Sequence, residues 1–302
     1  MNKKAAVFGS VGQLGTELVR ELNGRGYQVT GWDRKHLDIT DARKVEEALV
    51  QLDPAVVVNA AAYNQVDVAE EEPWAAFEVN GLAVRHIAVV CRQIDARLVH
   101  FSTDYVFDGQ AKRPYTEQDP THPLSAYAVS KLAGELYAQA YLDKALIVRT
   151  SGVFGPGALR TARGNFVELM LRLARAGQEI RVVKDHVGSP TYAPLLAART
   201  VDLVERKLAG VFHVAGGTPI SWFEWAGMIF RRAGLNPKIQ AVTERSYRTP
   251  ARRPKYSALS NNKMEECGLE PMPRLDRVLE EYFNARGEAA FGQKGKGPGP
   301  GR

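Results

Sequence analysis

Near its start the chain reads Val7-Phe8-Gly9-Ser10-Val11-Gly12-Gln13-Leu14-Gly15, in which the glycines follow the spacing G-x-x-G-x-x-G. This stretch joins a short apolar run to a segment whose apolar residues have helical spacing. Glycines at such a turn let backbone N–H groups approach a pyrophosphate at the N-terminus of the helix. The stretch therefore predicts a dinucleotide-binding loop, and a turn that merely requires glycine is the alternative. The expected cofactor contacts in it are Gly9, Val11, Gly12, Gln13 and Gly15.

Beyond this loop, the first 150 residues alternate apolar runs with helical patterns. The predicted strands are 5–8, 27–31, 55–58, 98–102 and 146–149, and the predicted helices are 12–22, 41–52, 73–94 and 125–141. Repeated strand–helix units of this length imply parallel strands joined by right-handed crossovers. We therefore expect an α/β protein with a Rossmann-type, doubly wound parallel sheet and a smaller C-terminal substrate-binding lobe.

The same patterns divide the chain into three regions. Residues 1–155 are predicted to form the dinucleotide-binding domain and residues 156–285 mainly the substrate-binding lobe, with some later elements returning to the sheet. Residues 286–302 are rich in Gly and are predicted to be disordered. We find no signal peptide, and no apolar run approaches the ~20 residues that cross a bilayer. With only two cysteines, which form no disulfide framework, a cytoplasmic location is the default expectation.

The net charge of +6 at pH 7 raises the question of a nucleic-acid partner. Most of the excess is local, because residues 286–302 carry a net +3 and residues 245–255 carry five basic side chains and no acid. The rest of the chain is mildly acidic, which argues against a nucleic-acid partner. Arginine forks suit diphosphate oxygens, so the stretch 245–255 is a candidate diphosphate site with Arg253 first. A solvated loop is the alternative.

The residues after the second predicted strand bear on the choice between NADH and NADPH. Asp33 comes 18 positions after Gly15, close to where an acid binds the adenosine ribose. Arg34 follows immediately and can pair with a 2′-phosphate. Asp38 and Ile39 come next, and Asp38 is placed either to reach the adenine or to cap the following helix. We expect NADPH as the cofactor, with NADH left open.

A catalytic pair is predicted on the helix 125–141, where Tyr127 and Lys131 stand four residues apart. Residues at i and i+4 share a helical face, and an ammonium beside a phenol favours loss of the phenolic proton. Such a tyrosine can protonate a carbonyl oxygen as a hydride reaches the carbon. Ser102-Thr103-Asp104, at the end of the fourth strand, adds hydroxyl donors at the sheet edge where ligands bind. The spacing alone also occurs on solvated helix faces.

Together, these motifs resemble the extended short-chain dehydrogenase/reductase family. The closer resemblance is to the dTDP-4-dehydrorhamnose reductases, and it covers roughly residues 4–283. The run Ser102-Thr103-Asp104-Tyr105-Val106-Phe107-Asp108-Gly109 is its most specific part. The other similar stretches are 59–63, 66–67, 123–127, 188–192, 212–217 and 253–254.

The resemblance implies reduction of the 4-keto group of a dTDP-linked 6-deoxyhexose to give dTDP-L-rhamnose, a nucleotide-sugar reaction with no nucleic-acid or membrane partner. Tyr127 would be the proton donor, Lys131 its partner, and Thr103 the residue that tunes the tyrosine. Thr103 and Asp104 would contact the sugar. The cofactor-lining residues that the resemblance implies are Val11, Gly12, Gln13, Asp38, Ala62 and Asn64.

One position departs from that family. Gly152 stands where the family commonly has an aromatic residue that stacks on the hexose. Loss of the ring removes an apolar contact with the sugar, so either the substrate is a different 4-ketohexose or Phe154 or Tyr192 supplies the ring. The acidic metal ligands that the family uses for dimerisation are not evident, so no metal is predicted, and a homodimer is left open.

Two other functions stand as alternatives. The first is an epimerase, or a reductase for another sugar nucleotide, on the same scaffold; it would keep Tyr127 and Lys131. The second is a non-catalytic binding module, as in the related regulatory subunit of methionine adenosyltransferase. A binding module has no need of Thr103, Tyr127 and Lys131 together, and this favours the enzyme.

Overall fold

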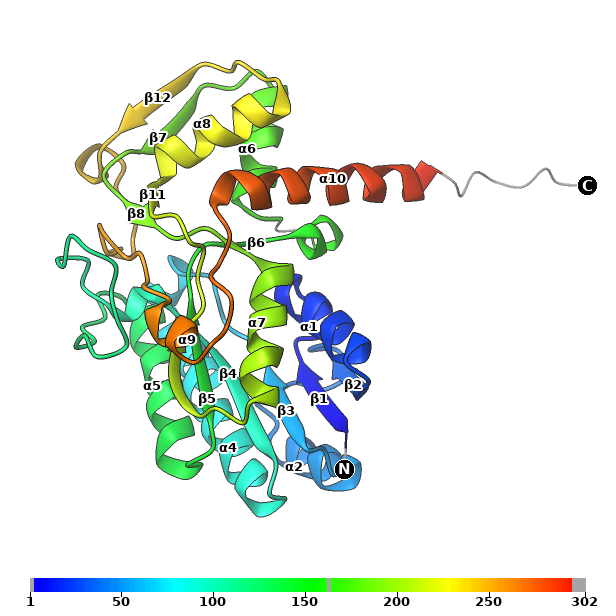
Figure 1. Ribbon diagram of the computed structural model, residues 1–302. Helices are drawn as coiled ribbons and strands as arrows, with labels where there is room; N and C mark the ends of the chain where they lie inside the picture. The colour runs from blue at the N-terminus through cyan, green and yellow to red at the C-terminus, as the bar shows by residue number, and fades with distance from the viewer. Residues whose placement is uncertain (1–2, 162–163, 295–302) are drawn as a thin grey trace, which may run out of the picture.

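The computed structural model describes residues 3–161 and 164–294, and a six-stranded parallel sheet forms its centre (Figure 1). Neighbouring strands follow the order β10-β5-β4-β3-β1-β2. The strands are β1 (Lys4–Phe8), β2 (Gln28–Trp32), β3 (Val56–Asn59), β4 (Arg97–Thr103), β5 (Leu146–Thr150) and β10 (Gly210–His213). β3 and β5 are buried along their whole length, because helices cover both faces of the sheet.

The covering helices divide the apolar interior into two cores. α1 and α7 enclose one core against the sheet, and α2, α4 and α5 enclose the other (Figure 1). Their bounds are α1 (Gln13–Gly24), α2 (Ala42–Leu52), α4 (Ala83–Gln93), α5 (Ala126–Tyr141) and α7 (Ala193–Glu205). Helices on both faces of a parallel sheet make the doubly wound fold, so the predicted fold class is confirmed.

The strand order reverses between β1 and β3, because β2 lies on one side of β1 and β3 on the other. In an open α/β sheet, ligands bind at the carboxyl ends of the strands at this point. Two connections leave the sheet there: the glycine loop after β1 and residues 60–64 after β3. The fold therefore brings the predicted dinucleotide loop next to the segment that contains Ala62 and Asn64.

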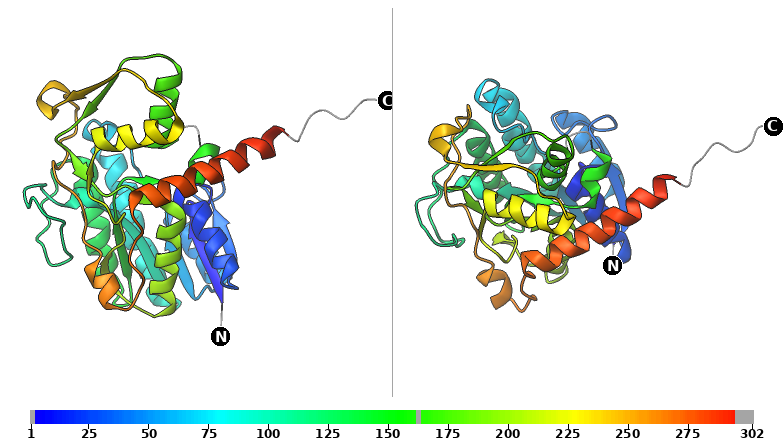
Figure 2. Two further views of the ribbon diagram at one scale, coloured as in Figure 1. Left: turned by 45° about the horizontal axis from the view of Figure 1, so that its top comes forward. Right: turned by 90° about the horizontal axis from the view of Figure 1, so that it is seen from above.

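A smaller lobe lies above the carboxyl edge of the sheet (Figures 1 and 2). It has an apolar core of its own, which α6, α8 and α10 share with short strands. Its elements are β6 (Val153–Phe154), α6 (Phe166–Arg175), β7 (Ile180–Val183), β8 (Val187–Gly188), β9 (Thr191–Tyr192), β11 (Ile220–Ser221), α8 (Trp222–Ala233), β12 (Ile239–Val242) and α10 (Leu275–Lys294). α9 (Asn262–Glu266) instead packs near β10. Because β10 pairs with β5, a segment far along the chain returns to the sheet.

Two segments differ from the sequence-based expectation. The helix predicted over 73–94 is divided, because α3 (Pro73–Phe77) passes through a π-helical turn, η2 (Glu78–Leu82), into α4. Residues 286–294 are helical as the end of α10, where the sequence predicted the start of a disordered tail. An ion pair of 2.7 Å between Arg286 and Glu168 joins α10 to α6 there. Residues 295–302 lie outside the described residues.

Four short 3-10 turns complete the described elements. They are η1 (Val68–Glu70), η3 (Asp104–Val106), η4 (Pro156–Arg160) and η5 (Glu244–Ser246). η3 follows β4 directly, so it turns the chain at the carboxyl edge of the sheet, where the predicted site residues Thr103 and Asp104 lie.

One segment, Pro73–Gln93, is long and apolar enough to cross a membrane by length and composition alone. Half of its most apolar 18-residue window is buried inside the protein, where α4 packs against the sheet and α5. The core helix of a water-soluble domain has the same composition. The segment therefore gives no support for a membrane partner.

Candidate active site

Two cavities meet at Tyr127, above the carboxyl ends of the strands. The first cavity has a volume of about 500 Å³ and follows the glycine loop and the ends of β1, β2 and β3. The second cavity, of about 520 Å³, lies between the sheet and the lobe. Tyr127, Ser102 and Thr150 line both. A molecule in either cavity can therefore reach the same phenol.

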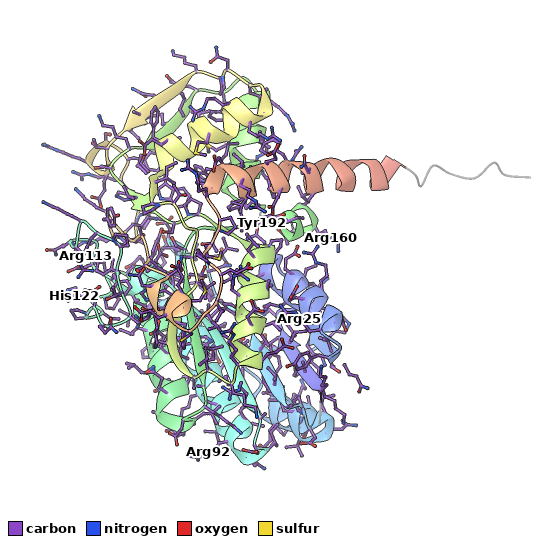
Figure 3. The ribbon with its side chains drawn as sticks, in the orientation of Figure 1. Arg25, Arg92, Arg113, His122, Arg160 and Tyr192 are labelled. Carbon is purple, nitrogen blue, oxygen red and sulfur yellow. The ribbon has the colours of Figure 1, made fainter. Side chains whose placement is uncertain are left out.

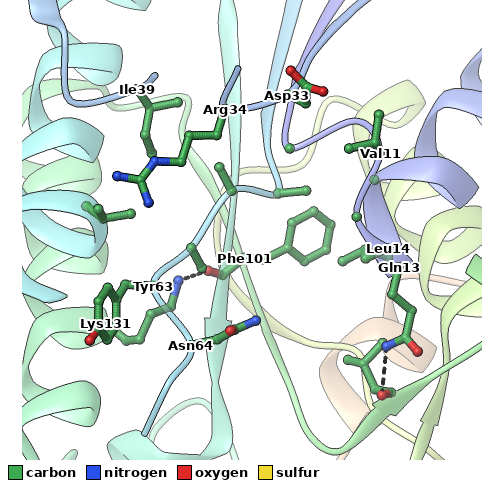
Figure 4. A pocket seen from close by; sticks show the side chains of 18 of the residues that line it. Val11, Gln13, Leu14, Asp33, Arg34, Ile39, Tyr63, Asn64, Phe101 and Lys131 are labelled. Carbon is green, nitrogen blue, oxygen red and sulfur yellow. Dashed lines mark hydrogen bonds between the residues drawn. The ribbon is translucent and has the colours of Figure 1, made fainter. Parts of the chain in front are cut away.

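The first cavity is lined by every residue that the sequence predicts to contact the cofactor. Asp33, Arg34 and Ile39 lie toward one end, and Lys131 and Asn64 lie farther along (Figure 4). The full set is Gly9, Val11, Gly12, Gln13, Gly15, Asp33, Arg34, Asp38, Ile39, Ala62, Asn64, Tyr127 and Lys131. Residues from four separate segments of the chain, 9–15, 33–39, 62–64 and 127–131, are thus gathered around one elongated space.

The glycine loop has the shape that a bound diphosphate requires. Gly9 has a φ of 73°, and a Cβ there would lie 2.8 Å from the backbone nitrogen of Ala61. A Cβ at Gly15 would lie 2.0 Å from the carbonyl oxygen of Gly9. α1 begins after Gly12 with neither a side-chain cap nor an acid in its first turn. The N–H groups of that turn are therefore left for an anion in the first cavity, and a pyrophosphate fits there.

At the far end of the first cavity, Asp33 and Asp38 form hydrogen bonds and an ion pair within their own loop. The hydrogen bond with the His36 side chain is the main cause of a lowered pKa at Asp33. Asp33 Oδ1 also accepts hydrogen bonds from the backbone N–H of Lys35 and of His36, both at 3.0 Å, which lower the pKa in the same direction. Asp38 Oδ2 pairs with Arg34 at 3.0 Å. The Arg34 side chain is 85% exposed. An exposed guanidinium at this end suits a 2′-phosphate.

Tyr127 and Lys131 lie on α5, which begins at a side-chain cap in which the Ser125 hydroxyl accepts from the N–H of Ala128 at 3.3 Å. Lys131 is buried, and its Nζ donates to the carbonyl oxygen of Phe101 at 2.6 Å (Figure 4). Burial lowers the pKa of Lys131 to about 8, and the charge of Glu135 opposes that shift. The ammonium therefore has a fixed place on the same face of α5 as Tyr127.

Two buried contacts fix α5 against the rest of the site. Arg149 of β5 donates from Nε to Glu135 Oε1 at 3.0 Å and from Nη2 to Glu135 Oε2 at 2.7 Å. Asn80 Nδ2 donates to Ser130 Oγ and to the Tyr63 carbonyl oxygen, both at 2.9 Å, and Asn80 Oδ1 accepts from the Tyr63 N–H at 2.9 Å. α5 is therefore tied both to the sheet and to the segment after β3.

Asp104 lies in the wall of the second cavity, inside a ring of hydroxyl groups. Thr103 donates to its Oδ1 at 3.1 Å, and Ser151 and Ser257 donate to its Oδ2 at 2.7 and 2.5 Å. Burial raises the pKa of Asp104 to about 6, against these hydrogen bonds. Because Ser257 comes from the last part of the chain, the carboxylate joins β4 and β5 to the lobe.

Two hydroxyls are left without a partner where the cavities meet. Ser102 Oγ and Thr150 Oγ1 are buried and make no hydrogen bond with the part of the chain that the structure describes. They stand at the ends of the neighbouring strands β4 and β5. A buried hydroxyl without a partner costs free energy, so a ligand that bonds to both would be stabilised there.

A comparison with known proteins identifies the family. A family model described as "RmlD substrate binding domain" matches residues 3–287. The dTDP-4-dehydrorhamnose reductase of Streptomyces griseus is 40% identical over 286 residues, which cover 92% of this chain and 92% of that protein. This chain belongs to the RmlD family.

Two further similarities come from a relative and from a solved structure. The dTDP-4-keto-6-deoxy-D-glucose reductase of Streptomyces niveus is 37% identical over 288 residues, covering 94% of this chain and 97% of that protein. The crystal structure of the dTDP-4-dehydrorhamnose reductase of Bacillus anthracis in complex with NADP has a TM-score of 0.89 and 36% identity, covering 94% of this chain and 99% of that chain. The family predicted from the sequence motifs is confirmed.

Phe154 and Tyr192 do not come to the site that was predicted for them. Their rings lie 5.5 Å apart, and Phe154 also packs at 5.3 Å against Trp225 and at 5.6 Å against Tyr282. Both are buried in the apolar core of the lobe. Figure 3 shows Tyr192 near α10 and the start of α7. Neither is among the described residues that line the two cavities, because the lobe needs these rings for its own core.

Arg253 also lies outside the lining of the two cavities. It pairs with Asp67 through two hydrogen bonds, of 3.0 and 2.8 Å, and also donates to Thr249 at 2.6 Å. A diphosphate would have to compete with Asp67 for this guanidinium. Among the described residues, no group of three or more His, Cys, Asp or Glu side chains could hold a metal ion.

Three residues of this RmlD-family site were not singled out from the sequence. Trp222 lines the second cavity, Thr150 lines both, and Asn80 holds α5 in place. A capping box of Ser221 and Glu224 is formed at the start of α8, and it makes Trp222 the first residue of that helix. No local sequence pattern shows that this ring lies beside Gly152, because Gly152 is 70 residues earlier in the chain.

Proposed function

We propose that this chain is an NADPH-dependent reductase that converts dTDP-4-dehydro-L-rhamnose to dTDP-L-rhamnose, with Tyr127 as the proton donor. The observation that carries the proposal is the position of Tyr127 where the two cavities meet, with Lys131 buried on the same helical face. The names of the relatives and the NADP in the Bacillus anthracis structure support the substrate and the cofactor. Arg34 favours NADPH, and NADH is the alternative.

The first cavity fits a dinucleotide, and the reduced nicotinamide would supply a hydride to C4 of the sugar. Tyr127 donates its phenolic proton to the oxygen at C4, so the ketone becomes an alcohol. Lys131, held by the Phe101 carbonyl, places a positive charge that stabilises the resulting phenolate. The buried hydroxyls of Ser102 and Thr150 are placed to orient the reacting groups around Tyr127.

The second cavity would hold the hexose. Thr103 and Asp104 line its polar wall, and Asp104 is oriented by the hydroxyls of Ser151 and Ser257. This wall would take the sugar hydroxyls. It leaves C4 near Tyr127, because that residue lines the same cavity.

A second candidate function is reduction of a different dTDP-linked 4-ketohexose. Gly152 in place of an aromatic residue favours it, since the contact with the sugar is altered. The relative named dTDP-4-keto-6-deoxy-D-glucose reductase gives it a precedent within the family. A non-catalytic module is disfavoured, because the buried Lys131 costs free energy that binding alone would not require.

The test is a coupled assay in which a dehydratase and an epimerase supply the 4-keto sugar. NADPH and NADH are compared in parallel, and the product is identified by NMR, which fixes the configuration at C4. We expect Tyr127→Phe to lose at least 100-fold in kcat while the Kd for NADPH stays unchanged. A variant close to wild type would contradict the role of Tyr127. We also propose a cytoplasmic location, where sugar nucleotides are made.

A further inference from the structure

An aromatic side chain does reach the space beside Gly152, although not from Phe154 or Tyr192, the positions that the sequence suggested. Trp222, the first residue of α8, lines the second cavity together with Tyr127, Thr103 and Asp104. It is half-buried, so part of the indole is covered by protein and part faces the cavity. The lobe that carries α8 lies above the carboxyl edge of the sheet (Figure 2).

The indole occupies the space beside Gly152. A Cβ built on Gly152 would lie 3.4 Å from Cη2 of Trp222 and 3.4 Å from Cα of Pro190. Gly152 also has a φ of 53°, a conformation that L side chains rarely adopt. An aromatic side chain at position 152 would therefore be strained and would meet Trp222. Trp222 therefore occupies space that a side chain at position 152 would need.

The orientation of the indole is fixed by neighbours outside the cavity. The Phe166 ring meets it edge-on, with centroids 4.8 Å apart. The capping box holds the start of α8, because the Ser221 hydroxyl accepts from the Glu224 N–H at 3.2 Å and the Glu224 carboxylate accepts from the Ser221 N–H at 3.1 Å. A ring positioned in this way is a preorganised surface for a ligand.

We propose that Trp222 is a specificity-determining residue that packs its indole against the hexose of the nucleotide-sugar substrate. The inference rests on the proposed function. The second cavity has hydroxyl and carboxylate groups on one side, at Thr103 and Asp104, and the indole on another. A hexose has the matching chemistry, since its hydroxyls bond at the rim of the ring and its C–H groups form an apolar face. The hexose, and not the nucleotide, belongs beside Tyr127, because its C4 is reduced there.

The experiment measures KM for the 4-keto sugar nucleotide, KM for NADPH and the inhibition constant of dTDP. Trp222→Ala is expected to raise KM for the sugar nucleotide about tenfold, which corresponds to roughly 1.4 kcal/mol, with kcat within about threefold. Trp222→Phe is expected to fall between that variant and wild type. The KM for NADPH and the inhibition constant of dTDP should not change, because neither ligand contains the hexose. Trp74→Ala, at an 82% exposed tryptophan, is the control and should change none of these values.

Two results would overturn the inference. One is an unchanged KM for the sugar nucleotide. The other is a rise in the inhibition constant of dTDP in Trp222→Ala that equals the rise in KM, because the indole would then contact the nucleotide and not the hexose. An unchanged KM for NADPH, with an unchanged circular dichroism spectrum, separates both results from misfolding.

Failure of the proposed function is recognised separately. The wild-type protein is first assayed with the dTDP-linked substrate, and absence of turnover would remove the function without deciding the role of Trp222. Its role is then read from tryptophan fluorescence on titration with dTDP-L-rhamnose and with dTDP. If dTDP-L-rhamnose quenches the fluorescence, dTDP does not, and the quenching is lost in Trp222→Phe, the contact between the indole and the hexose is supported. Equal signals in wild type and Trp222→Phe contradict it.

Discussion

Removal of the Glu135 charge tests how the interior of the protein sets the chemistry of Tyr127 and Lys131. Glu135 and Arg149 have side chains only 2% and 6% exposed, and they pair at 2.7 Å. The Arg149 guanidinium also lies 5.2 Å from the ring centre of Phe107, and its Nη1 makes no hydrogen bond with the described residues. In Glu135→Gln, the guanidinium stays buried while its counter-charge is lost.

The expected loss in the free energy of unfolding follows from the burial of the pair. Removal of one partner of a buried ion pair costs about 3–5 kcal/mol. Because the glutamine oxygen can still accept one hydrogen bond, we expect a loss of about 3 kcal/mol in Glu135→Gln. For a domain of this size, each kcal/mol lowers Tm by roughly 2 °C. The expected loss in Tm is therefore about 6 °C. The matched control is Glu47→Gln in the exposed Arg43–Glu47 pair, whose side chains are 73% and 60% exposed, where the expected loss is below about 1 kcal/mol.

The second effect is on pH dependence. Burial lowers the pKa of Lys131 to about 8, and Glu135 opposes this by favouring the ammonium. Without the carboxylate, Lys131 loses its proton at lower pH. In the proposed mechanism, reduction needs a positive charge beside Tyr127. The alkaline limb of kcat/KM, expected near pH 8 in wild type, should therefore move to lower pH in Glu135→Gln and stay in place in Glu47→Gln.

The assays are thermal unfolding and kcat/KM from pH 6 to 10. The double variant Glu135→Leu/Arg149→Met replaces the pair by apolar groups, so it should recover much of the Tm but keep the shifted alkaline limb. The reasoning is refuted if Glu135→Gln melts within 1 °C of wild type, or if its alkaline limb coincides with that of Glu47→Gln.

Three further outcomes are expected. Gly15→Ala places a Cβ 2.0 Å from the Gly9 carbonyl oxygen, so the loop must move by about 1 Å. The Kd for NADPH, measured by fluorescence, should then rise at least ~100-fold. A Kd near that of wild type would contradict the loop geometry. Arg34→Ala should raise KM for NADPH about tenfold and leave KM for NADH unchanged, and equal effects on both would remove Arg34 from the 2′-phosphate. Burial raises the pKa of Asp104 to about 6, so the folded state binds this proton more tightly than the unfolded state does. The free energy of unfolding of wild type, relative to that of Asp104→Asn, should therefore increase by up to ~3 kcal/mol as pH falls from 7 to 4. A difference that stays constant with pH in urea unfolding would show that Asp104 titrates normally.

The features that the sequence predicted are those carried by neighbouring residues. Gly9, Gly12 and Gly15 belong to one turn, and Tyr127 and Lys131 to one helical face, so spacing alone indicates how they lie. The parallel sheet followed from repeated apolar runs in the same way. These local patterns were sufficient to predict the fold class and to choose residues that the structure gathers around the first cavity.

In the second cavity, Thr103 and Asp104 were named from the sequence motifs, and both line its wall. The aromatic residue beside Gly152 could not be predicted, because it comes from a distant segment. Phe154 is close in sequence to Gly152, yet the lobe core takes its ring. Trp222 is 70 residues away, yet its ring stands beside Gly152. Which aromatic residue faces a ligand depends on how the lobe packs. The sequence alone does not distinguish an aromatic residue of the core from one in a cavity wall, because both positions favour the same apolar side chains.

α5 joins the proposed catalytic groups to the stability of the protein. Tyr127, Lys131 and Glu135 follow one another at intervals of four residues, so a phenol, an ammonium and a carboxylate stand on one helical face, and Arg149 of β5 pairs with the last of them. The ion pair that anchors the helix also supplies the negative charge that keeps Lys131 protonated. A substitution at Glu135 or Arg149, neither of which lines either of the two cavities, should therefore change the pH at which Lys131 loses its proton as well as the melting temperature. A screen for stability alone would detect these positions, but only a pH profile would separate them from ordinary core residues.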